Sequence, residues 1–450
     1  MKIALLPLGR PTFDVPYAEE KLAGMLAHLD GWAAANGHPI TGPRTLLMGG
    51  DEGASATEEQ ADALLILQVT FTDAAFATQA ATGFDGPVAV WAIPEPRAGG
   101  RLRLNAFCGL NLLSHALGLN ARPFTWAYAD APDLDALLLG PVVAPKHGVP
   151  STAPARAIRR DLRIARIGER PGGFDTCAYD KAALRALTGA EVTELALPDL
   201  FDRARALPEA PAAYVAQAKA LGGVDTLDKG ELDRSLRLAG ALDDLRAEHR
   251  FDAMAIRCWP ETFTEYGGAV CGPVSMLGEA RTPCACEADV YGAVTQAILQ
   301  DVADAPVFLA DLVDMDGETG VVWHCGQAPV SMAAKAPDAT VHTNRKQALL
   351  LEFPLKAGRV TLFRLSQAYG RAQAVIATGE VLDAPMAFTG TSGTVRFDRG
   401  ADAVLADVMA SGLEHHMALA YGDHGPALAG VAAGLGIDLL ELGSTARIGS

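Results

Sequence analysis

The chain has 450 residues, which is too long for one hydrophobic core and predicts two or three domains. Hydrophobic residues make up 50% and charged residues 20%, as in folded globular proteins. The net charge is −17, and an acidic chain without a basic run is repelled by nucleic acid and by anionic membranes, so neither is expected as a partner. Seven cysteines without a secretory signal indicate reduced thiols and a cytoplasmic location.

The first third of the chain alternates short apolar runs with helical patterns. Three apolar runs predict buried parallel strands: 2–8, 61–69 and 87–93. Helical spacing at 17–36 predicts a helix, and the stretch 104–121, interrupted by Asn, Ser and His, predicts a buried helix rather than a membrane span. This alternation predicts a doubly wound α/β domain over residues 1–153. A proline-containing linker is expected at 146–161.

A second α/β unit begins near residue 162. Its opening "IARIGERPGGFD" weakly repeats "IALLPLGRPTFD" from the start of the chain. Helical patterns and then strand patterns follow in the order 180–189, 229–249, 251–258 and 282–287. We therefore expect a second doubly wound α/β domain over residues 154–302.

From about residue 303 the pattern changes to strands joined by short turns. The predicted strands are 340–355, 359–366, 372–382 and 393–400. A helix is predicted at 425–437. Residues 303–450 are therefore expected to form a β-rich, barrel-like domain that ends in a helix.

Several common catalytic motifs do not occur in the chain. No G-x-G-x-x-G follows a predicted strand and no G-x-x-x-x-G-K-[ST] is present, so a nucleotide cofactor is not expected. There is also no G-x-S-x-G element of a serine hydrolase. Cys284 and Cys286 form a C-x-C pair rather than the repeated C-x₂₋₄-C of structural zinc sites, which favours buried thiols over a zinc–thiolate site.

Two acidic residues, Glu287 and Asp311, lie at positions where a carboxylate indicates a possible binding or catalytic role. Glu287 ends a predicted strand, where ligands gather in α/β sheets, although it would also suit a helix start. Asp311 lies inside an apolar strand, where a carboxylate must be satisfied by a partner or bound to a cation. Near the C-terminus, "LEHHMALAYGDHG" holds His415, His416 and His424, the last of which is expected at a helix start. With His416, the two carboxylates form a set that suits Mn²⁺ or Mg²⁺ and leaves positions open for sugar or water oxygens.

These segments resemble the L-fucose isomerase and L-arabinose isomerase superfamily, especially its shorter fucose isomerase-like members. The resemblance lies in the spacing of the two acids (311 − 287 = 24), in "CEADVYGA", in the terminal "YGDHGPALAGVAAGLGI" and in the N-terminal "GRPTFD". It follows the whole chain in domain order and is weakest in the middle.

The resemblance implies two α/β domains and a C-terminal β-rich domain, assembled as a trimer or hexamer. It also implies Mn²⁺-dependent aldose–ketose isomerisation through a cis-enediol, with Mg²⁺ or Co²⁺ as other candidate ions. Glu287 and Asp311 would be metal ligands and acid/base groups, and His416 would be the third ligand. Three further residues are expected in the sugar pocket: Arg10, Trp259 and His324.

Two other functions remain compatible with the sequence. A non-catalytic sugar-binding protein with two α/β lobes would not need the Glu287, Asp311 and His416 set, and such proteins are usually exported. A related metal-dependent epimerase or lyase begins with the same proton abstraction. The sugar itself is not fixed, because four cationic residues would suit an anionic sugar bearing a sulfonate or phosphate but would equally suit the surface: Arg10, Arg257, Arg345 and Lys346.

Overall fold

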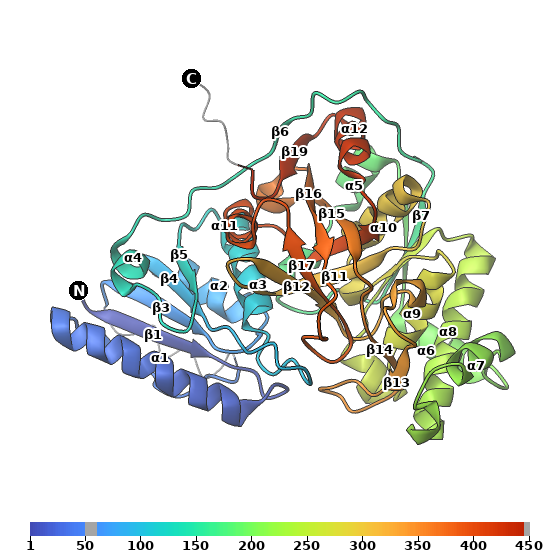
Figure 1. Ribbon diagram of the computed structural model, residues 1–450, viewed down its shortest axis with the longest axis horizontal. Coiled ribbons are helices and arrows are strands. Elements are labelled where there is room, and N and C mark those ends of the chain that lie inside the picture. The colour runs from blue at the N-terminus through green and yellow to red at the C-terminus, as the bar shows by residue number, and fades with distance from the viewer. Residues whose placement is uncertain (50–60, 445–450) are drawn as a thin grey trace.

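The computed structural model describes residues 1–49 and 61–444. Within these residues the strands form two parallel sheets and one large mixed sheet. Figure 1 shows the first parallel sheet at the left, the mixed sheet in the centre and helices of the second parallel sheet at the right. The predicted α/β class is confirmed, whereas the domain boundaries at 153 and 302 remain predictions.

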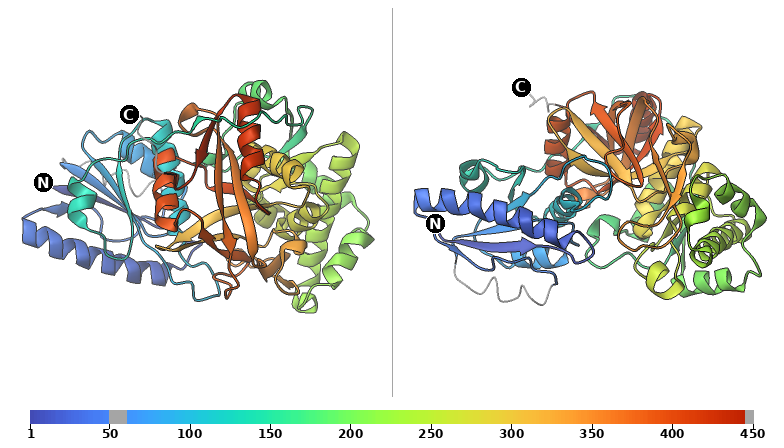
Figure 2. Two further views of the ribbon diagram at one scale, coloured as in Figure 1. Left: turned by 45° about the horizontal axis from the view of Figure 1, so that its top comes forward. Right: turned by 60° about the horizontal axis from the view of Figure 1, so that its bottom comes forward.

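The first sheet is parallel and has the order β2-β1-β3-β4-β5. Its strands are β1 (Ile3–Leu8), β2 (Ile40–Thr41), β3 (Ala63–Gln68), β4 (Val88–Ala92) and β5 (Thr125–Tyr128). The helices of this part are α1 (Val15–Asn36), α2 (Ala75–Thr82), α3 (Ala106–Leu119) and α4 (Leu134–Leu139). Helix α1 begins where the Asp14 side chain accepts the Tyr17 N–H, ends at the left-handed Gly37 (φ 67°), and lies along one face of the sheet (Figure 2). The strands predicted at 2–8, 61–69 and 87–93 are confirmed, as are both helices.

The second sheet is also parallel and has the order β10-β9-β7-β8. Its strands are β7 (Arg163–Ile167), β8 (Glu191–Leu195), β9 (Ala253–Ile256) and β10 (Cys284–Ala285). The helices are α5 (Lys181–Thr188), α6 (Leu197–Ala206), α7 (Ala212–Lys219), α8 (Lys229–His249), α9 (Cys271–Glu279) and α10 (Val290–Ala303). The predicted strand 282–287 is shortened to β10, because the chain turns into a short 3₁₀ helix at Cys286–Ala288.

The third sheet is mixed and contains a closed barrel. Its strands are β6 (Val149–Pro150), β11 (Phe308–Met315), β12 (Thr319–His324), β13 (Asp338–Thr340), β14 (Leu350–Pro354), β15 (Gly358–Ser366), β16 (Gln373–Val381), β17 (Thr391–Phe397), β18 (His416–Tyr421) and β19 (Asp438–Glu441). Neighbouring strands pair in the order β17-β12-β11-β18-β15-β16, and β16 pairs back with β17, which closes the ring over these described strands. The helices α11 (Ala401–Ser411) and α12 (Gly425–Leu435) accompany it, and α12 lies within the predicted terminal helix.

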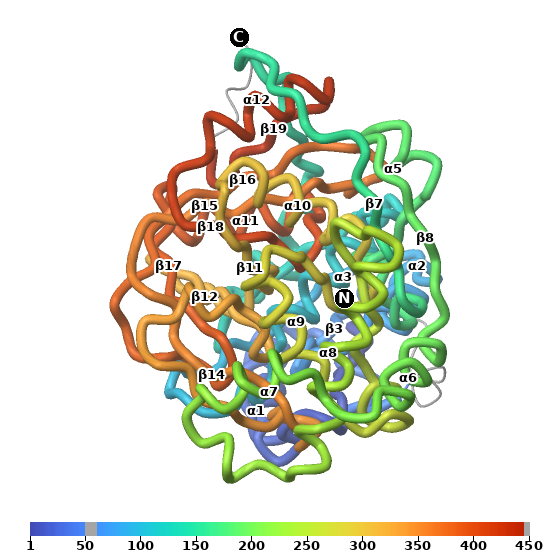
Figure 3. Tube along the Cα trace, turned by 90° about the vertical axis from the view of Figure 1, so that its right-hand side faces the viewer, coloured from blue at the N-terminus to red at the C-terminus, as the bar shows by residue number. Residues whose placement is uncertain are grey.

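Two segments differ from the sequence-based expectation. The predicted strand 340–355 is wrong over residues 341–349, which connect β13 to β14 without strand structure because a polar run, 343–347, interrupts the apolar pattern. The predicted linker at 146–161 contains β6, which pairs antiparallel with β19 at the edge of the third sheet. Figure 3 shows this segment beside β19 and α12, where the Ser151 hydroxyl donates to the Ala429 carbonyl at 2.8 Å.

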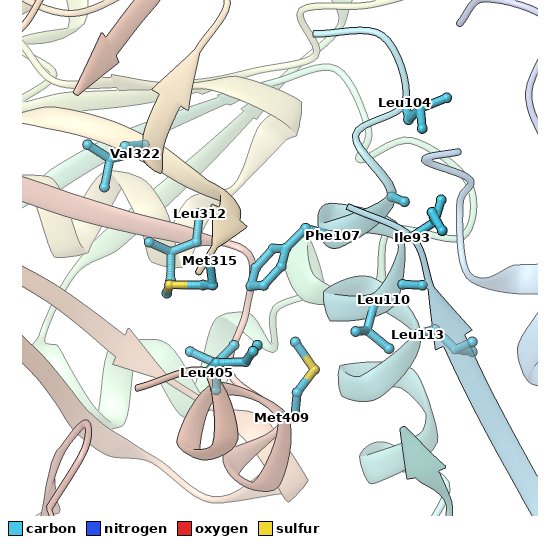
Figure 4. Packing of buried hydrophobic residues seen from close by; sticks show 14 of the residues in the cluster. Ile93, Leu104, Phe107, Leu110, Leu113, Leu312, Met315, Val322, Leu405 and Met409 are labelled. Carbon is cyan, nitrogen blue, oxygen red and sulfur yellow. The ribbon is translucent and has the colours of Figure 1, made fainter. Parts of the chain in front are cut away.

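Helix α3 joins the first sheet to the barrel. Residues 106–118 of α3 are all buried, which explains why this long stretch contains no charged residue. In Figure 4, Phe107 of α3 points toward Leu312 and Met315 of β11, with Leu405 and Met409 of α11 close by. One hydrophobic cluster therefore continues from the first sheet into the barrel. No helix in the described ranges has both the length and the apolar character needed to cross a membrane.

Candidate active site

One pocket lies between the two parallel sheets and the barrel. Arg10 follows β1, Trp259 follows β9 and Glu287 follows β10, and all three line the pocket from the carboxyl ends of the parallel strands. The barrel contributes Asp311 and His324. The pocket is partly open to solvent. Because ligands of α/β proteins bind at the carboxyl ends of strands, this pocket is the candidate active site.

Strand register brings the predicted metal ligands together. Asp311 lies within β11 directly opposite His416, the first residue of β18, so their side chains share one face of the sheet. The Nε2 atom of His416 is 3.4 Å from Oδ1 of Asp311. Glu287 approaches from the second sheet, with its Oε2 atom 3.8 Å from the same nitrogen. Three residues from three different elements thus meet around the Nε2 atom of His416.

The hydrogen bonds around His416 indicate that a cation fits here. Its Nδ1–H donates to Oδ2 of Asp289 at 2.9 Å, which leaves the Nε2 atom facing the carboxylates of Glu287 and Asp311. Within the described residues, neither this Nε2 atom nor Oδ1 of Asp311 has a hydrogen-bond partner, although both are buried. A buried ring nitrogen that faces two carboxylates needs a positive charge beside it, which is either a second proton on the ring or a metal ion bound to the lone pair of the neutral ring. Two carboxylates and one neutral imidazole are a suitable ligand set for a divalent ion.

Asp289 is a functional residue that the sequence did not indicate. Its carboxylate accepts the Gly292 N–H at 2.8 Å, which caps α10, and it forms an ion pair with the fully buried Arg364 at 2.6 Å. Burial raises the pKa of Asp289, but the charge of Arg364 and the hydrogen bond from His416 outweigh this effect and lower the pKa. Metal-binding histidines usually donate their other ring N–H to a carboxylate. In the sequence, Asp289 could have been noticed only as an acidic residue that precedes an apolar helical pattern, which indicates a helix N-cap.

Glu287 is held by its backbone and by two hydrogen bonds. Both Glu287 (φ 59°) and Ala288 (φ 54°) are left-handed, a conformation that costs about 1–3 kcal/mol for a residue other than glycine. The indole N–H of Trp259 donates to Oε1 at 3.0 Å, and Nε2 of His415 donates to Oε2 at 2.9 Å. Burial raises the pKa of Glu287, but the hydrogen bond and charge of His415 and the hydrogen bond from Trp259 lower it to about 2. Glu287 is therefore ionised at neutral pH.

Adjacent residues of a strand point to opposite faces, but His415 and His416 both turn toward Glu287. Because β18 begins at His416, His415 precedes the strand and is not subject to the alternation of strand side chains. The two ring centroids are 3.9 Å apart, and both rings approach Glu287. The Nε2–H of His415 is already used by Glu287, so His415 acts at this point as a hydrogen-bond donor. His424 is the N-cap residue of α12, as predicted.

His324, the last residue of β12, lies in the pocket wall. Its Nδ1 atom accepts the Cys325 N–H at 2.8 Å, which leaves the ring proton on Nε2. That Nε2 atom is buried without a partner in the described part of the chain, and one ring nitrogen of His324 lies within 4.8 Å of ligand atoms of Asp311 and His416. Burial lowers the pKa of His324, but Cys325 and Asp311 outweigh this effect and raise the pKa. His324 is thus better suited to donate a hydrogen bond than to bind a metal.

The thiols near the pocket do not form a convincing metal site. The Sγ atoms of Cys271 and Cys325 are 3.5 Å apart, and His342 lies within reach of both. However, Nδ1 of His342 accepts the backbone N–H groups of Asn344 and Arg345 at 3.2 and 3.3 Å, so the ring has no free lone pair for an ion. All seven cysteines lie within the described residues, and none of them forms a disulfide bond.

Of the four cationic residues considered for an anionic sugar, two reach the pocket. The guanidinium carbons of Arg10 and Arg345 lie 4.8 and 6.0 Å from the centroid of the Trp259 ring. Arg257 instead donates to Glu261 at 2.5 Å in a separate depression at the end of β9. Lys346 does not line the pocket. The structure therefore brings Arg10, with Trp259 and Arg345, into the same pocket as the candidate metal ligands.

Comparisons with known proteins identify the family to which the chain belongs. Residues 51–135 match the N-terminal domain family of fucose and sulfoquinovose isomerases, and residues 322–442 match the C-terminal domain family of L-fucose isomerase. The sulfoquinovose isomerase of Alkalicoccus urumqiensis is 35% identical over 374 residues, 80% of this chain and 82% of that protein. The sulfoquinovose isomerase of Priestia aryabhattai is 31% identical over 442 residues, 94% of each chain. That of Clostridium sp. (strain MSTE9) is 30% identical over 436 residues, 94% of this chain and 95% of that protein.

The predicted resemblance is confirmed by these matches, which extend over both ends of the chain and over nearly its whole length. The chain belongs to the fucose isomerase-like family and is an aldose–ketose isomerase.

Proposed function

We propose that the chain converts a sulfonated aldose into the corresponding ketose, with a divalent cation held by Glu287, Asp311 and His416. The names of the relatives support the sulfonated sugar as substrate class. The observation that carries the cation site is the buried Nε2 atom of His416, which faces the Asp311 carboxylate at 3.4 Å and has no hydrogen-bond partner in the described residues. Mn²⁺ is the proposed ion, with Mg²⁺ or Co²⁺ as alternatives.

The bound ion would stabilise the negative charge that develops on the substrate oxygens. The protein's own part is proton transfer. One of the two carboxylates, Glu287 or Asp311, takes the C2 proton while the other serves the neighbouring hydroxyl, so the sugar passes through a cis-enediol. The hydrogen bonds from His415 and Trp259 keep Glu287 ionised and oriented. The buried Nε2–H of His324 offers a donor to a sugar oxygen in the same pocket.

The epimerase and lyase considered from the sequence are distinguished from the proposed isomerase by the product that each would form. An epimerase would return an aldose and a lyase would break a carbon–carbon bond, whereas the proposed reaction yields a ketose. A non-catalytic sugar-binding protein is not supported by membership of an isomerase family. We also propose a homo-oligomer, a trimer or hexamer, which light scattering on the purified protein would test.

The test is isomerisation of sulfoquinovose followed by NMR in D₂O. Chelation should abolish ketose formation, Mn²⁺ should restore it, and the ketose should carry solvent deuterium at C1, because the proton taken from C2 resides on a carboxylate that exchanges with water before C1 is protonated. Full activity in a preparation shown to be metal-free by elemental analysis would refute the cation site. A product without solvent deuterium at every degree of conversion would contradict the roles of Glu287 and Asp311.

A further inference from the structure

The sugar pocket contains two arginines that have no carboxylate partner among the described residues. Neither Arg10 nor Arg345 forms a salt bridge within the described residues, although the chain as a whole has a net charge of −17. Burial lowers the pKa of Arg10, Asp73 partly offsets this, and the charge of Arg345 lowers the pKa further. Burial also lowers the pKa of Arg345. Two partly buried cations of this kind are stabilised by an anion that lies between them.

A third arginine holds the two loops together. Arg101 donates from Nε to Oδ1 of Asn344 at 2.9 Å, and from Nη2 to the carbonyl of Thr12 at 2.7 Å. Asn344 is the residue before Arg345, and Thr12 lies two residues after Arg10. The guanidinium of Arg101 thus fixes the loop after β1 against the segment 341–349 between β13 and β14.

The turn that carries Arg345 is also organised from within. The His342 ring accepts the backbone N–H groups of Asn344 and Arg345, and the His342 carbonyl accepts the N–H of Lys346 at 2.7 Å. Burial and the charge of Arg345 lower the pKa of His342 to about 3, so the ring stays neutral and continues to accept. The position of Arg345 is therefore set before any ligand binds, which reduces the entropic cost of binding.

Trp259 lies between the two arginines, Arg10 and Arg345, and the proposed catalytic carboxylate of Glu287. Its indole N–H contacts the Glu287 carboxylate, while both guanidinium groups approach its ring. One indole therefore separates the two cations from the carboxylate proposed to act at C1 and C2. In a terminally sulfonated or phosphorylated hexose, the anionic group lies at the opposite end of the carbon chain from C1 and C2, which matches this arrangement.

We propose that Arg10 and Arg345 form the subsite for the terminal anionic group of the substrate, a sulfonate or a phosphate, and that Arg345 sets the preference for anionic over neutral sugars. Guanidinium groups recognise such oxyanions through paired N–H donors. The assignment of this group to a substrate rests on the proposed isomerase function, whereas anion binding by the two arginines does not.

The first test measures binding without turnover. The probes are three non-reacting hexitols, one terminally sulfonated, one terminally phosphorylated and one neutral and terminally deoxygenated, titrated by calorimetry into chelator-treated full-length protein. Arg345→Gln should weaken binding of the anionic hexitols about 10- to 100-fold and leave the neutral hexitol unchanged, as expected for loss of a charged hydrogen bond. Arg345→Lys should recover part of the affinity, because it keeps the charge but not the paired donors. The anion that binds more tightly to the native protein identifies the terminal group.

Arg257→Gln is the matched control, because Arg257 is paired with Glu261 outside the pocket; it should alter none of the three affinities. Thermal unfolding of each variant checks that the fold is intact. Equal loss of affinity for all three hexitols, or no change with Arg345→Gln, would overturn the proposed subsite. Arg345-dependent binding of an anionic hexitol together with no isomerisation of any sulfonated aldose would refute the proposed reaction while supporting the subsite.

Discussion

The protonation of individual histidine nitrogens determines what each histidine can do at this site. The Asp289 carboxylate accepts a hydrogen bond from the Nδ1–H of His416, and this orients the ring so that its Nε2 atom faces Asp311. The Nε2–H of His415 is directed at Glu287, and the Nδ1 atom of His324 accepts a backbone N–H. Although the three rings lie close together, only His416 presents a lone pair to the two carboxylates.

Substitution of the two adjacent histidines should therefore have different effects. His416→Ala should lower the Mn²⁺ affinity by about 10-fold or more, since loss of even an outer partner of a metal ligand has such an effect. His415→Ala should retain the ion, because His415 donates to Glu287 rather than offering a lone pair. Calorimetric titration of both variants, after circular dichroism shows that they are folded, measures the difference. Retention by His416→Ala and loss by His415→Ala would reverse the assignment of the two rings.

At the scale of elements, helix α10 and the candidate metal centre share one side chain. The Asp289 carboxylate caps the helix by accepting the Gly292 N–H, and it also orients His416. Gly292 leaves room for this carboxylate, because a Cβ atom there would lie 2.4 Å from Oδ2 of Asp289 and 3.2 Å from Nη1 of Arg364. The start of α10 is thus tied sterically to the geometry of the site.

Gly292→Ala should consequently affect both stability and metal binding. The added methyl group must displace the Asp289 carboxylate, so we expect a loss of about 1–3 kcal/mol in the free energy of unfolding together with weaker Mn²⁺ binding. Gly278→Ala in α9 is the control, because its Cβ atom would meet only the Pro329 ring, at an ordinary 3.5 Å from Cγ and 4.0 Å from Cδ. Denaturant unfolding and calorimetry measure the two effects. Unchanged Mn²⁺ affinity in Gly292→Ala would show that the cap and the site are independent.

The elements with long apolar patterns were predictable from the sequence, as β1, β3, β4 and α3 illustrate. Short elements were not: β2 and β6 have two residues each, which is too short for a recognisable period, and β10 was predicted as a longer strand than it is. Asp311 was indicated because a carboxylate within an apolar strand is costly. The partners Asp289 and Arg364 were not, since their pairing depends on α10 packing against β15, a contact between segments far apart in the chain.

For the whole molecule, the candidate metal site joins the second sheet to the barrel. Glu287 comes from the end of the second sheet, whereas Asp311 and His416 belong to barrel strands. A cation bound by all three residues would add a link between these parts that is present only in the folded state.

Mn²⁺ should therefore stabilise the entire chain against heat. An ion at ~100 times its Kd adds about 2.7 kcal/mol to the free energy of unfolding, provided that it does not bind the unfolded chain. Differential scanning calorimetry should show a higher Tm with Mn²⁺, reversal by chelator, and a much smaller increase for Asp311→Asn. An equal increase in the native protein and in Asp311→Asn would place the stabilising ion elsewhere.

The segment between β13 and β14 has a consequence for the diversity of this family. The groups proposed to move protons include Asp311, on a barrel strand, whereas Arg345 is carried by residues 341–349, which form no strand. Connecting segments accept substitutions and changes in length far more readily than the strands that they join. Under the proposed roles, evolution can exchange this segment and so redirect the protein to a sugar with a different terminal group, while the same carboxylates continue to perform the same reaction. Grafting the 341–349 segment between relatives is accordingly a direct route to altered sugar preference.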